Sequence, residues 1–173
     1  CTDGCTMEHE QGVATMALLM SGDVVLDATS TIDLDGLGFE AQAGPTPGCA
    51  GGYRVGACGG AHGGLAGRGH GNNGTSVAAV GGAGGGTIRI QVGGTFSLHG
   101  VVSADGLNGG SAGSSYAAGG GAGGAIWITA GDIVSAGGDL IRANGGVGNN
   151  QAYADGGSGG GGRIRIDAAS IPL

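Results

Sequence analysis

Hydrophobic and polar residues alternate in short segments along the chain, and the most regular of these segments recur. Residues 88–92, 126–130 and 164–168 begin Ile-Arg-Ile or Ile-Trp-Ile and are spaced 38 residues apart, each after a run of glycines. Residues 24–28 read as an earlier copy. Alternation directs every second side chain to the same face, so the pattern predicts four strands with one buried and one solvated face.

A second type of segment follows the first. Residues 32–36, 102–106 and 141–145 also alternate, and each ends in Asp-Gly or Asn-Gly, which favours a turn. Stacking repeat on repeat would place Ile32, Val102 and Ile141 in one interior wall. The pattern therefore predicts two strands per repeat.

The same stacking assigns the first strands to an inner ladder and an outer column. The predicted inner ladder is Val24, Ile88, Ile126 and Ile164, followed by Leu26, Ile90, Ile128 and Ile166. The predicted outer column is Val25, Arg89, Trp127 and Arg165. An indole between two guanidinium groups is a favourable cation–π arrangement.

Glycine determines how the rest of each repeat is interpreted. The chain has 47 glycines in 173 residues and only 3% aromatic residues, so a conventional globular core is not expected. Residues 106–124 and 145–162 form glycine-rich arms, either as loops or as polyglycine II helices packed side by side; their recurrence between strands in register favours order. We predict an all-β fold, a parallel β-solenoid (β-helix-like) of about 38-residue repeats with these arms.

The chain divides by composition into two parts. Residues 1–21 carry all three methionines and are expected to form an N-terminal cap or joint. Residues 22–173 are expected to form the glycine-rich solenoid, with a disulfide-braced arm at 37–80. The four cysteines, Cys1, Cys5, Cys49 and Cys58, are an even number, which favours disulfides and an oxidising compartment. Local pairs 1–5 and 49–58 are preferred, with crossed pairs open, and we expect an extracellular or cell-surface location.

The charge argues against nucleic acid as a partner, and the length of the apolar runs argues against a membrane span. The net charge is -7 and all six basic residues are arginine, which disfavours nucleic acid. No apolar run approaches the length of a membrane span.

Metal and cofactor sites are weakly supported. Asp33 and Asp35 have a spacing that could bind calcium, but Asp35 precedes glycine as Asp105 and Asn144 do, which is a turn requirement. Thiol and imidazole groups fall within one arm without the spacing of a chelating motif. These residues are Cys49, Cys58, His62 and His70. We predict no metal and no cofactor.

Catalysis is not indicated either. None of the four histidines has a Ser and Asp arrangement around it, and the outer column lacks an acid–base cluster, so we predict that the chain is not an enzyme. Two binding or modification candidates remain. Trp127 is a candidate platform for stacking a ligand such as a sugar. Asn73-Gly74-Thr75 is a glycosylation sequon, which makes Asn73 a candidate site.

Residues 119–131 (GGGAGGAIWITAG) and 141–146 (IRANGG) resemble units of glycine-rich repeat sequences in secreted or surface proteins of bacteria. The resemblance extends over roughly residues 22–171 and leaves out the cysteine-bearing arm and the first 21 residues. It implies a parallel β-solenoid on an extracellular protein and carries no catalytic residues.

These observations lead to two functional expectations. Residues Arg163, Ile164, Arg165 and Ile166 belong to a strand with no evident cap after it, so its edge is a candidate assembly surface. The first expectation is a structural subunit of an extracellular fibre or surface layer that self-associates head to tail into a homopolymer. The alternative is an adhesin or a glycan- or ice-binding module that uses the glycine-rich face, with a cell-surface glycan as its partner.

Overall fold

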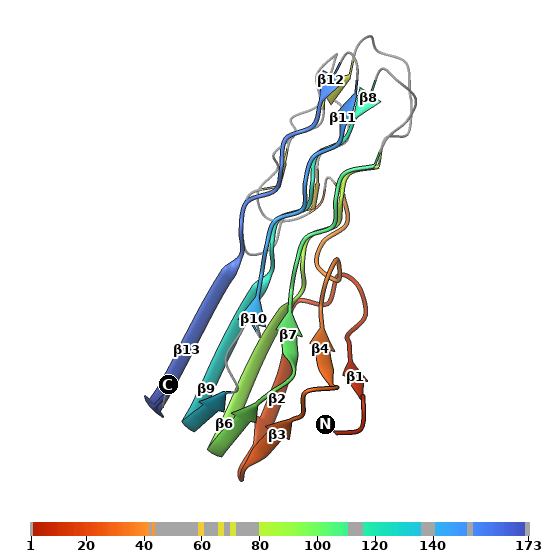
Figure 1. Ribbon diagram of the computed structural model, residues 1–173. Helices are drawn as coiled ribbons and strands as arrows, with labels where there is room; N and C mark the ends of the chain where they lie inside the picture. Colours follow the sequence, from red (N-terminus) through yellow and green to blue (C-terminus); the bar gives the residue numbers. More distant parts are fainter. Residues whose placement is uncertain are drawn as a thin grey trace.

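The structure is a computed structural model that describes residues 2–41, 43, 59–60, 66–67, 70–71, 80–110, 116–135, 141–151 and 154–171. Among the described residues there are thirteen strands and no helix. The strands are β1 (Thr6–Met7), β2 (Met16–Met20), β3 (Val24–Leu26), β4 (Thr31–Asp33), β5 (His70–Gly71), β6 (Thr87–Leu98), β7 (Val101–Ser103), β8 (Tyr116–Ala117), β9 (Ala125–Ser135), β10 (Ile141–Arg142), β11 (Asn150–Gln151), β12 (Ala154–Asp155) and β13 (Arg163–Ser170). Figure 1 shows the longer strands gathered at one end of an elongated molecule and the glycine-rich arms running side by side away from them.

The larger sheet has five parallel strands in the order β13-β9-β6-β2, with β3 also paired to β6. The repeat of 38 residues sets its register, since Ile88 pairs with Ile126 and Ile126 with Ile164. The predicted inner ladder is confirmed for Ile88 and Ile126, which are each 1% exposed. Repeats stacked in register therefore build this sheet.

The N-terminal end of the inner ladder differs from the prediction. Met16, not Val24, lies beside Ile88, and Val24 lies beside Phe96 further along the same strand. The prediction that Val24 and Leu26 continue the inner ladders and that Val25 continues the outer column is wrong, since Leu18 lies beside Ile90 and Leu26 beside Leu98. A strand formed by Met-Ala-Leu-Leu-Met also alternates correctly, and the long strand β6 has room for both β2 and β3 along one edge.

The smaller sheet has four parallel strands in the order β1-β4-β7-β10. Ile32 pairs with Val102 and Val102 with Ile141, which confirms the predicted second wall. The wall extends by one further residue, because Met7 of β1 pairs with Ile32. In each of two repeats the next described strand after a long one is short, β7 after β6 and β10 after β9, so one repeat contributes to both sheets.

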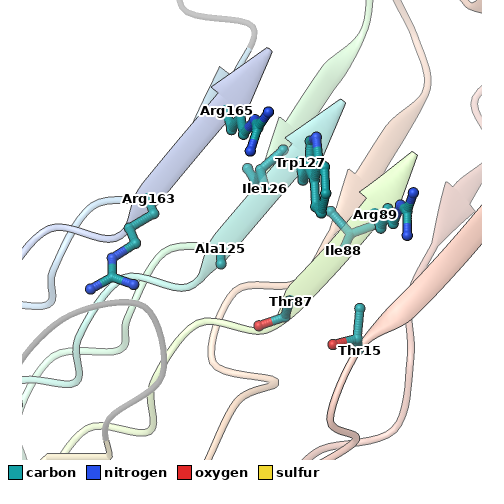
Figure 2. A pocket seen from close by; sticks show the side chains of 9 residues that line it. All are labelled: Thr15, Thr87, Ile88, Arg89, Ala125, Ile126, Trp127, Arg163 and Arg165. Carbon is teal, nitrogen blue, oxygen red and sulfur yellow. The ribbon is translucent and has the colours of Figure 1, made fainter. Parts of the chain in front are cut away.

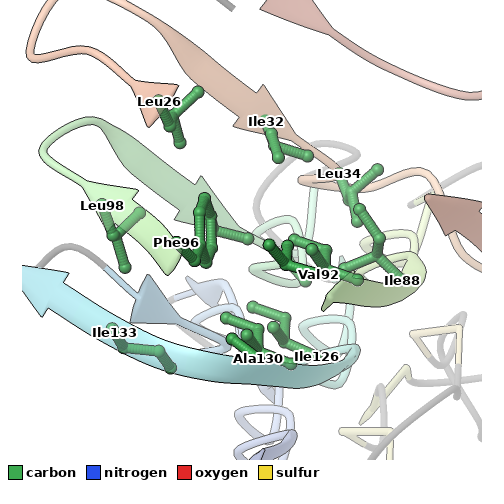
Figure 3. Close-up of a cluster of buried hydrophobic side chains, with 14 of the residues drawn as sticks. Leu26, Ile32, Leu34, Ile88, Val92, Phe96, Leu98, Ile126, Ala130 and Ile133 are labelled. Carbon is green, nitrogen blue, oxygen red and sulfur yellow. The ribbon is translucent and has the colours of Figure 1, made fainter. Parts of the chain in front are cut away.

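The hydrophobic core lies between the two sheets. Figure 3 shows its side chains converging from β3, β4, β6 and β9. The largest fully buried side chain is that of Phe96, which is 1% exposed. At about 25 cal/mol per Å² of apolar surface, burial of a side chain of this size contributes a few kcal/mol to folding. The core thus depends on few but completely buried side chains.

The glycine-rich arms are hydrogen-bonded to one another. Within residues 120–124, successive N–H groups donate to different neighbouring segments, and groups three residues apart donate to the same one. The bonds run from Gly120 and Gly123 to Gly157 and Gly160, from Gly121 and Gly124 to Leu107 and Ala104, and from Ala122 to Gly60. A left-handed helix with three residues per turn has this periodicity, because it makes no internal hydrogen bonds and directs its groups to its neighbours.

Close contact between arms, not a positive φ, is what requires glycine in them. A Cβ built on Gly121 would collide with the carbonyl oxygen of Ala83 in the adjacent arm. Among described residues, positive φ angles at glycine occur at Gly4, Gly12 and Gly36, which lie outside the arms of residues 106–124 and 145–162. The arms therefore pack backbone against backbone.

The predicted β-solenoid is wrong. The described chain forms two separate parallel sheets of five and four strands, and the remaining strands make two antiparallel pairs, β5 with β8 and β11 with β12. A solenoid coil needs walls whose side chains fill its interior. The glycine arms have few side chains larger than alanine to build such a wall, and their backbones bond to one another instead.

Residues 2–21 contribute a strand to each of the two sheets. Residues of this part form β1 in the smaller sheet and β2 in the larger one. Most residues of the arm at 37–80 lie outside the described ones.

Candidate functional site

A column of one tryptophan between two arginines marks the outer face of the larger sheet. Arg89, Trp127 and Arg165 are in register on β6, β9 and β13. The guanidinium carbons of Arg89 and Arg165 lie 4.6 and 4.8 Å from the centre of the Trp127 ring. The predicted outer face of these strands is confirmed, and Figure 2 shows the three side chains standing on successive strands.

Asp167 completes this column. Its Oδ2 atom accepts hydrogen bonds from Trp127 Nε1 at 2.9 Å and from Arg165 Nε at 2.8 Å. Both hydrogen bonds lower the pKa of Asp167 from its ordinary value of 3.8, and the bond from Trp127 has the larger effect. The carboxylate therefore stays ionised at neutral pH and neutralises Arg165. Sequence reasoning missed Asp167, although it is a diagonal neighbour of Trp127 in the predicted register and so within reach of a long side chain.

A shallow groove of about 330 Å³ runs beside the column. Arg89, Arg163 and Arg165 line it, so three of the six arginines of this acidic chain lie along one groove. Thr15, Thr87 and Ala125 also line it, near the starts of the strands (Figure 2). Stacking of a ligand on Trp127 would require one guanidinium group to move, whereas a carboxylate could approach Arg163 directly.

The candidate assembly edge is formed by the first residues of β13. Arg163, Ile164, Arg165 and Ile166 begin this strand, which lies at one edge of the larger sheet. Ile164 and Ile166 were predicted to be buried, and they are 46% and 39% exposed. The reason is that the smaller sheet, in the part of the chain that the structure describes, ends at β10, so none of its described strands lies opposite β13.

An apolar pocket of about 170 Å³ lies at the opposite end of the sheets. Its walls combine residues of both sheets with residues of the core, including Met7, Leu18, Met20, Ile32 and Phe96. Met7 and Leu18 are only partly buried. The two ends of the core are thus both apolar and both incompletely covered.

The aspartates considered for calcium have a structural role. Asp35 accepts a hydrogen bond from the backbone N–H of Asp105, and Asp105 accepts one from the N–H of Asn144, each at 2.6 Å. Arg142 forms ion pairs with both carboxylates, at 3.6 Å to Asp35 and 2.9 Å to Asp105. The ladder ties repeat to repeat where the chain leaves the smaller sheet, with Gly36 at a φ of 68°.

The structure describes the remaining candidates only in part. Cys5 is disulfide-bonded. Cys1, Cys49, Cys58, His62 and Asn73 lie outside the described residues, so their pairing, zinc binding and glycosylation stay predictions. Of His70, only the backbone in β5 is described. Within the described ranges no group of three or more metal-ligating side chains is found.

The comparisons with known proteins give no match. A scan against protein-family models finds no matching family, and searches of curated proteins and of solved structures find no similar chain. Among the described residues, no helix is long and apolar enough to span a membrane.

Proposed function

We propose that this chain is a structural subunit of an extracellular fibre or surface layer that associates head to tail, and that it is not an enzyme. The observation that carries the proposal is the uncovered β13. It combines an open backbone edge with two isoleucines that are 46% and 39% exposed on the side that is buried elsewhere in the ladder. Open edges of this kind pair with further strands unless they are blocked.

Three further features support the proposal. All strand pairs in both large sheets are parallel, and a second copy that continues this parallel pairing at β13 has the same orientation as the first and leaves its own β13 free. Heterologous contacts of this kind generate filaments when the rotation from one copy to the next does not close a ring. The disulfide at Cys5 supports an oxidising, extracellular setting, and the resemblance to bacterial surface repeats agrees with it.

The test is electron microscopy and sedimentation of the chain over a range of concentrations. We expect filaments above a threshold concentration. The double variant Ile164→Pro and Ile166→Pro removes two backbone donors from β13 and should give a folded chain that forms none. Ile171→Pro changes an equally exposed isoleucine outside the strand and is the matched control. A wild-type chain that remains monomeric at every concentration would contradict the proposal.

A binding module is the second candidate, favoured by the groove of Arg89, Arg163 and Arg165. Three guanidinium groups beside an indole suit an extended ligand that carries carboxylates, such as an acidic glycan. Calorimetric titration with an oligouronate, and with a neutral oligosaccharide of the same length, tests this candidate. Binding of the acidic ligand alone, lost in Arg163→Gln, would support it; equal or absent heat for both sugars would exclude it.

A further inference from the structure

At the C-terminal end of the core, the two sheets stop at different levels. The larger sheet continues past β9 to β13, whereas the described part of the smaller sheet stops at β10. The inner face of β13 therefore forms a projecting step. Ile164 and Ile166 stand on this step, while their ladder neighbours Ile126 and Ile128 are 1% and 0% exposed.

At the other end, the offset between the sheets is reversed. The smaller sheet continues past β4 to β1, whereas the described strands of the larger sheet end with β2 and β3. Met7 of β1 extends the wall of Ile32, Val102 and Ile141 by one position. The space beside it is the apolar pocket of about 170 Å³, lined also by Leu18 and Met20.

We propose that two copies of this chain meet in a half-lap joint, in which each end supplies the strand that the other lacks. In the joint, β1 of the second copy lies opposite β13 of the first and pairs with its β10. At the same time, β2 of the second copy pairs with β13. This inference rests on the proposed head-to-tail assembly and specifies the two surfaces that form the contact.

The registers within one copy carry across this joint without a shift. Met16, Ile88, Ile126 and Ile164 form one ladder within a copy, and Leu18, Ile90, Ile128 and Ile166 form the next. Each ladder begins with a partly exposed apolar residue of β2 and ends with an exposed isoleucine of β13. In the joint, Ile164 would lie beside Met16 of the second copy, and Ile166 beside Leu18. Each apolar ladder would continue from one copy to the next.

The smaller sheet fits in the same register. Within one copy its column runs Met7, Ile32, Val102 and Ile141, so Ile141 would lie beside Met7 of the second copy. The pocket at the N-terminal end would then receive the isoleucines that project from β13. Side chains that are half-exposed at both ends would become buried together, which is the source of the association free energy.

Charge favours a second copy over an unrelated strand. The first 40 residues contain eight of the thirteen acidic residues and no lysine or arginine. The joining strand β13 carries Arg163 and Arg165 on its outer face, and because Asp167 of the same strand pairs with Arg165, the unbalanced positive charge is that of Arg163. An acidic end and an end with arginines attract each other in the head-to-tail orientation, whereas two acidic ends repel.

Two variants blocked at opposite ends test the joint. Ile164→Glu with Ile166→Glu places carboxylates on the step of β13 and leaves the N-terminal end unchanged. Met7→Glu with Leu18→Glu does the reverse; Met7→Glu alone is a milder version in case the pair disturbs folding. Because burying an uncompensated carboxylate is costly, we expect each block to raise the concentration at which filaments appear by about tenfold or more. Val147→Glu changes an exposed valine of an arm and is the matched control.

Mixing the two blocked variants distinguishes this joint from other contacts. Each variant retains one intact end, and these ends are complementary. An equimolar mixture should give a 1:1 heterodimer by native mass spectrometry and analytical ultracentrifugation, while each variant alone stays monomeric. If the wild type forms filaments but the mixture stays monomeric, or if a blocked variant still polymerises as the wild type does, the half-lap joint is wrong and head-to-tail assembly must use another contact. A monomeric wild type would instead refute the proposed function itself.

Discussion

Replacing a single glycine by alanine should have opposite effects at two positions in the arms. Gly121 is buried, and a Cβ there would collide with the carbonyl oxygen of Ala83. Gly161 is exposed, and the nearest atom to a Cβ there is the carbonyl oxygen of Ala143 at 4.0 Å. Neither has a positive φ, so backbone strain is the same for both substitutions. The pair therefore isolates the effect of contact between arms.

The structure sets the size of both effects. To admit a methyl group at Gly121, the arms must separate where they are joined by the bonds from Gly82 to Gly119 at 3.0 Å and from Gly85 to Ala122 at 2.9 Å. Overpacking costs roughly 1–3 kcal/mol and each weakened hydrogen bond up to about 1 kcal/mol, so Gly121→Ala should destabilise the fold by roughly 2–4 kcal/mol. Gly161→Ala should stabilise it by about 0.4–1 kcal/mol, because alanine restricts the unfolded chain.

Thermal unfolding followed by calorimetry or circular dichroism measures the difference. For a chain of this length each kcal/mol moves Tm by about 2–4 °C, so Gly121→Ala should lower Tm by about 5–15 °C and Gly161→Ala should raise it by about 1–4 °C. Equal, small changes for the two variants would mean that the arms are flexible loops and would refute the packing argument. If the strand signal is lost in a single cooperative transition whose midpoint shifts with the arm substitutions, the packing argument is supported.

Three further outcomes are expected. Ile126→Ala should cost about 2–5 kcal/mol in urea unfolding and Ile164→Ala well under half as much, because only the first is covered on both sides; equal costs would contradict the ladder. Hydrogen bonds lower the pKa of Asp27 from 3.8 to about 2, and the bond from the Thr29 hydroxyl has the largest effect. The stability from Asp27 is thus complete above about pH 4 and lost as the pH falls toward 2, so Asp27→Asn should flatten Tm against pH in this window. Mass spectrometry of the untreated chain should find four fewer hydrogens than after reduction, as two disulfides require; four free thiols would overturn them.

The parts of the fold that were predicted are those that repeat. Ile88, Ile126 and Arg89 could be assigned to faces because alternation within a strand and a fixed spacing between strands together determine the register. The Arg–Trp–Arg column followed from the same two facts. Where the repeat is imperfect, as at Met16 of β2, similarity between segments selected the wrong strand, because unbranched side chains fill the same ladder as isoleucine.

Other features depend on information that no single segment carries. Ile164 is exposed because the two sheets are offset at this end of the core. The repeat pattern in the sequence predicts which residues share a ladder, but it does not show where the opposite sheet ends. The contact of Gly121 with Ala83 joins two arms whose sequences are both almost featureless. A solenoid was therefore predicted where the chain builds two sheets and a bundle of hydrogen-bonded arms.

The three-residue hydrogen-bonding period of the arms restricts how such a protein can change length. An arm residue bonds to one neighbour, the next residue to another, and only the third returns to the first neighbour, as at Gly120 and Gly123. Inserting one or two residues would rotate every later N–H group toward the wrong neighbour, whereas inserting three would restore all of them. Arms of this kind should therefore tolerate insertions and deletions of three residues, and not of one or two, because the backbone makes one turn every three residues.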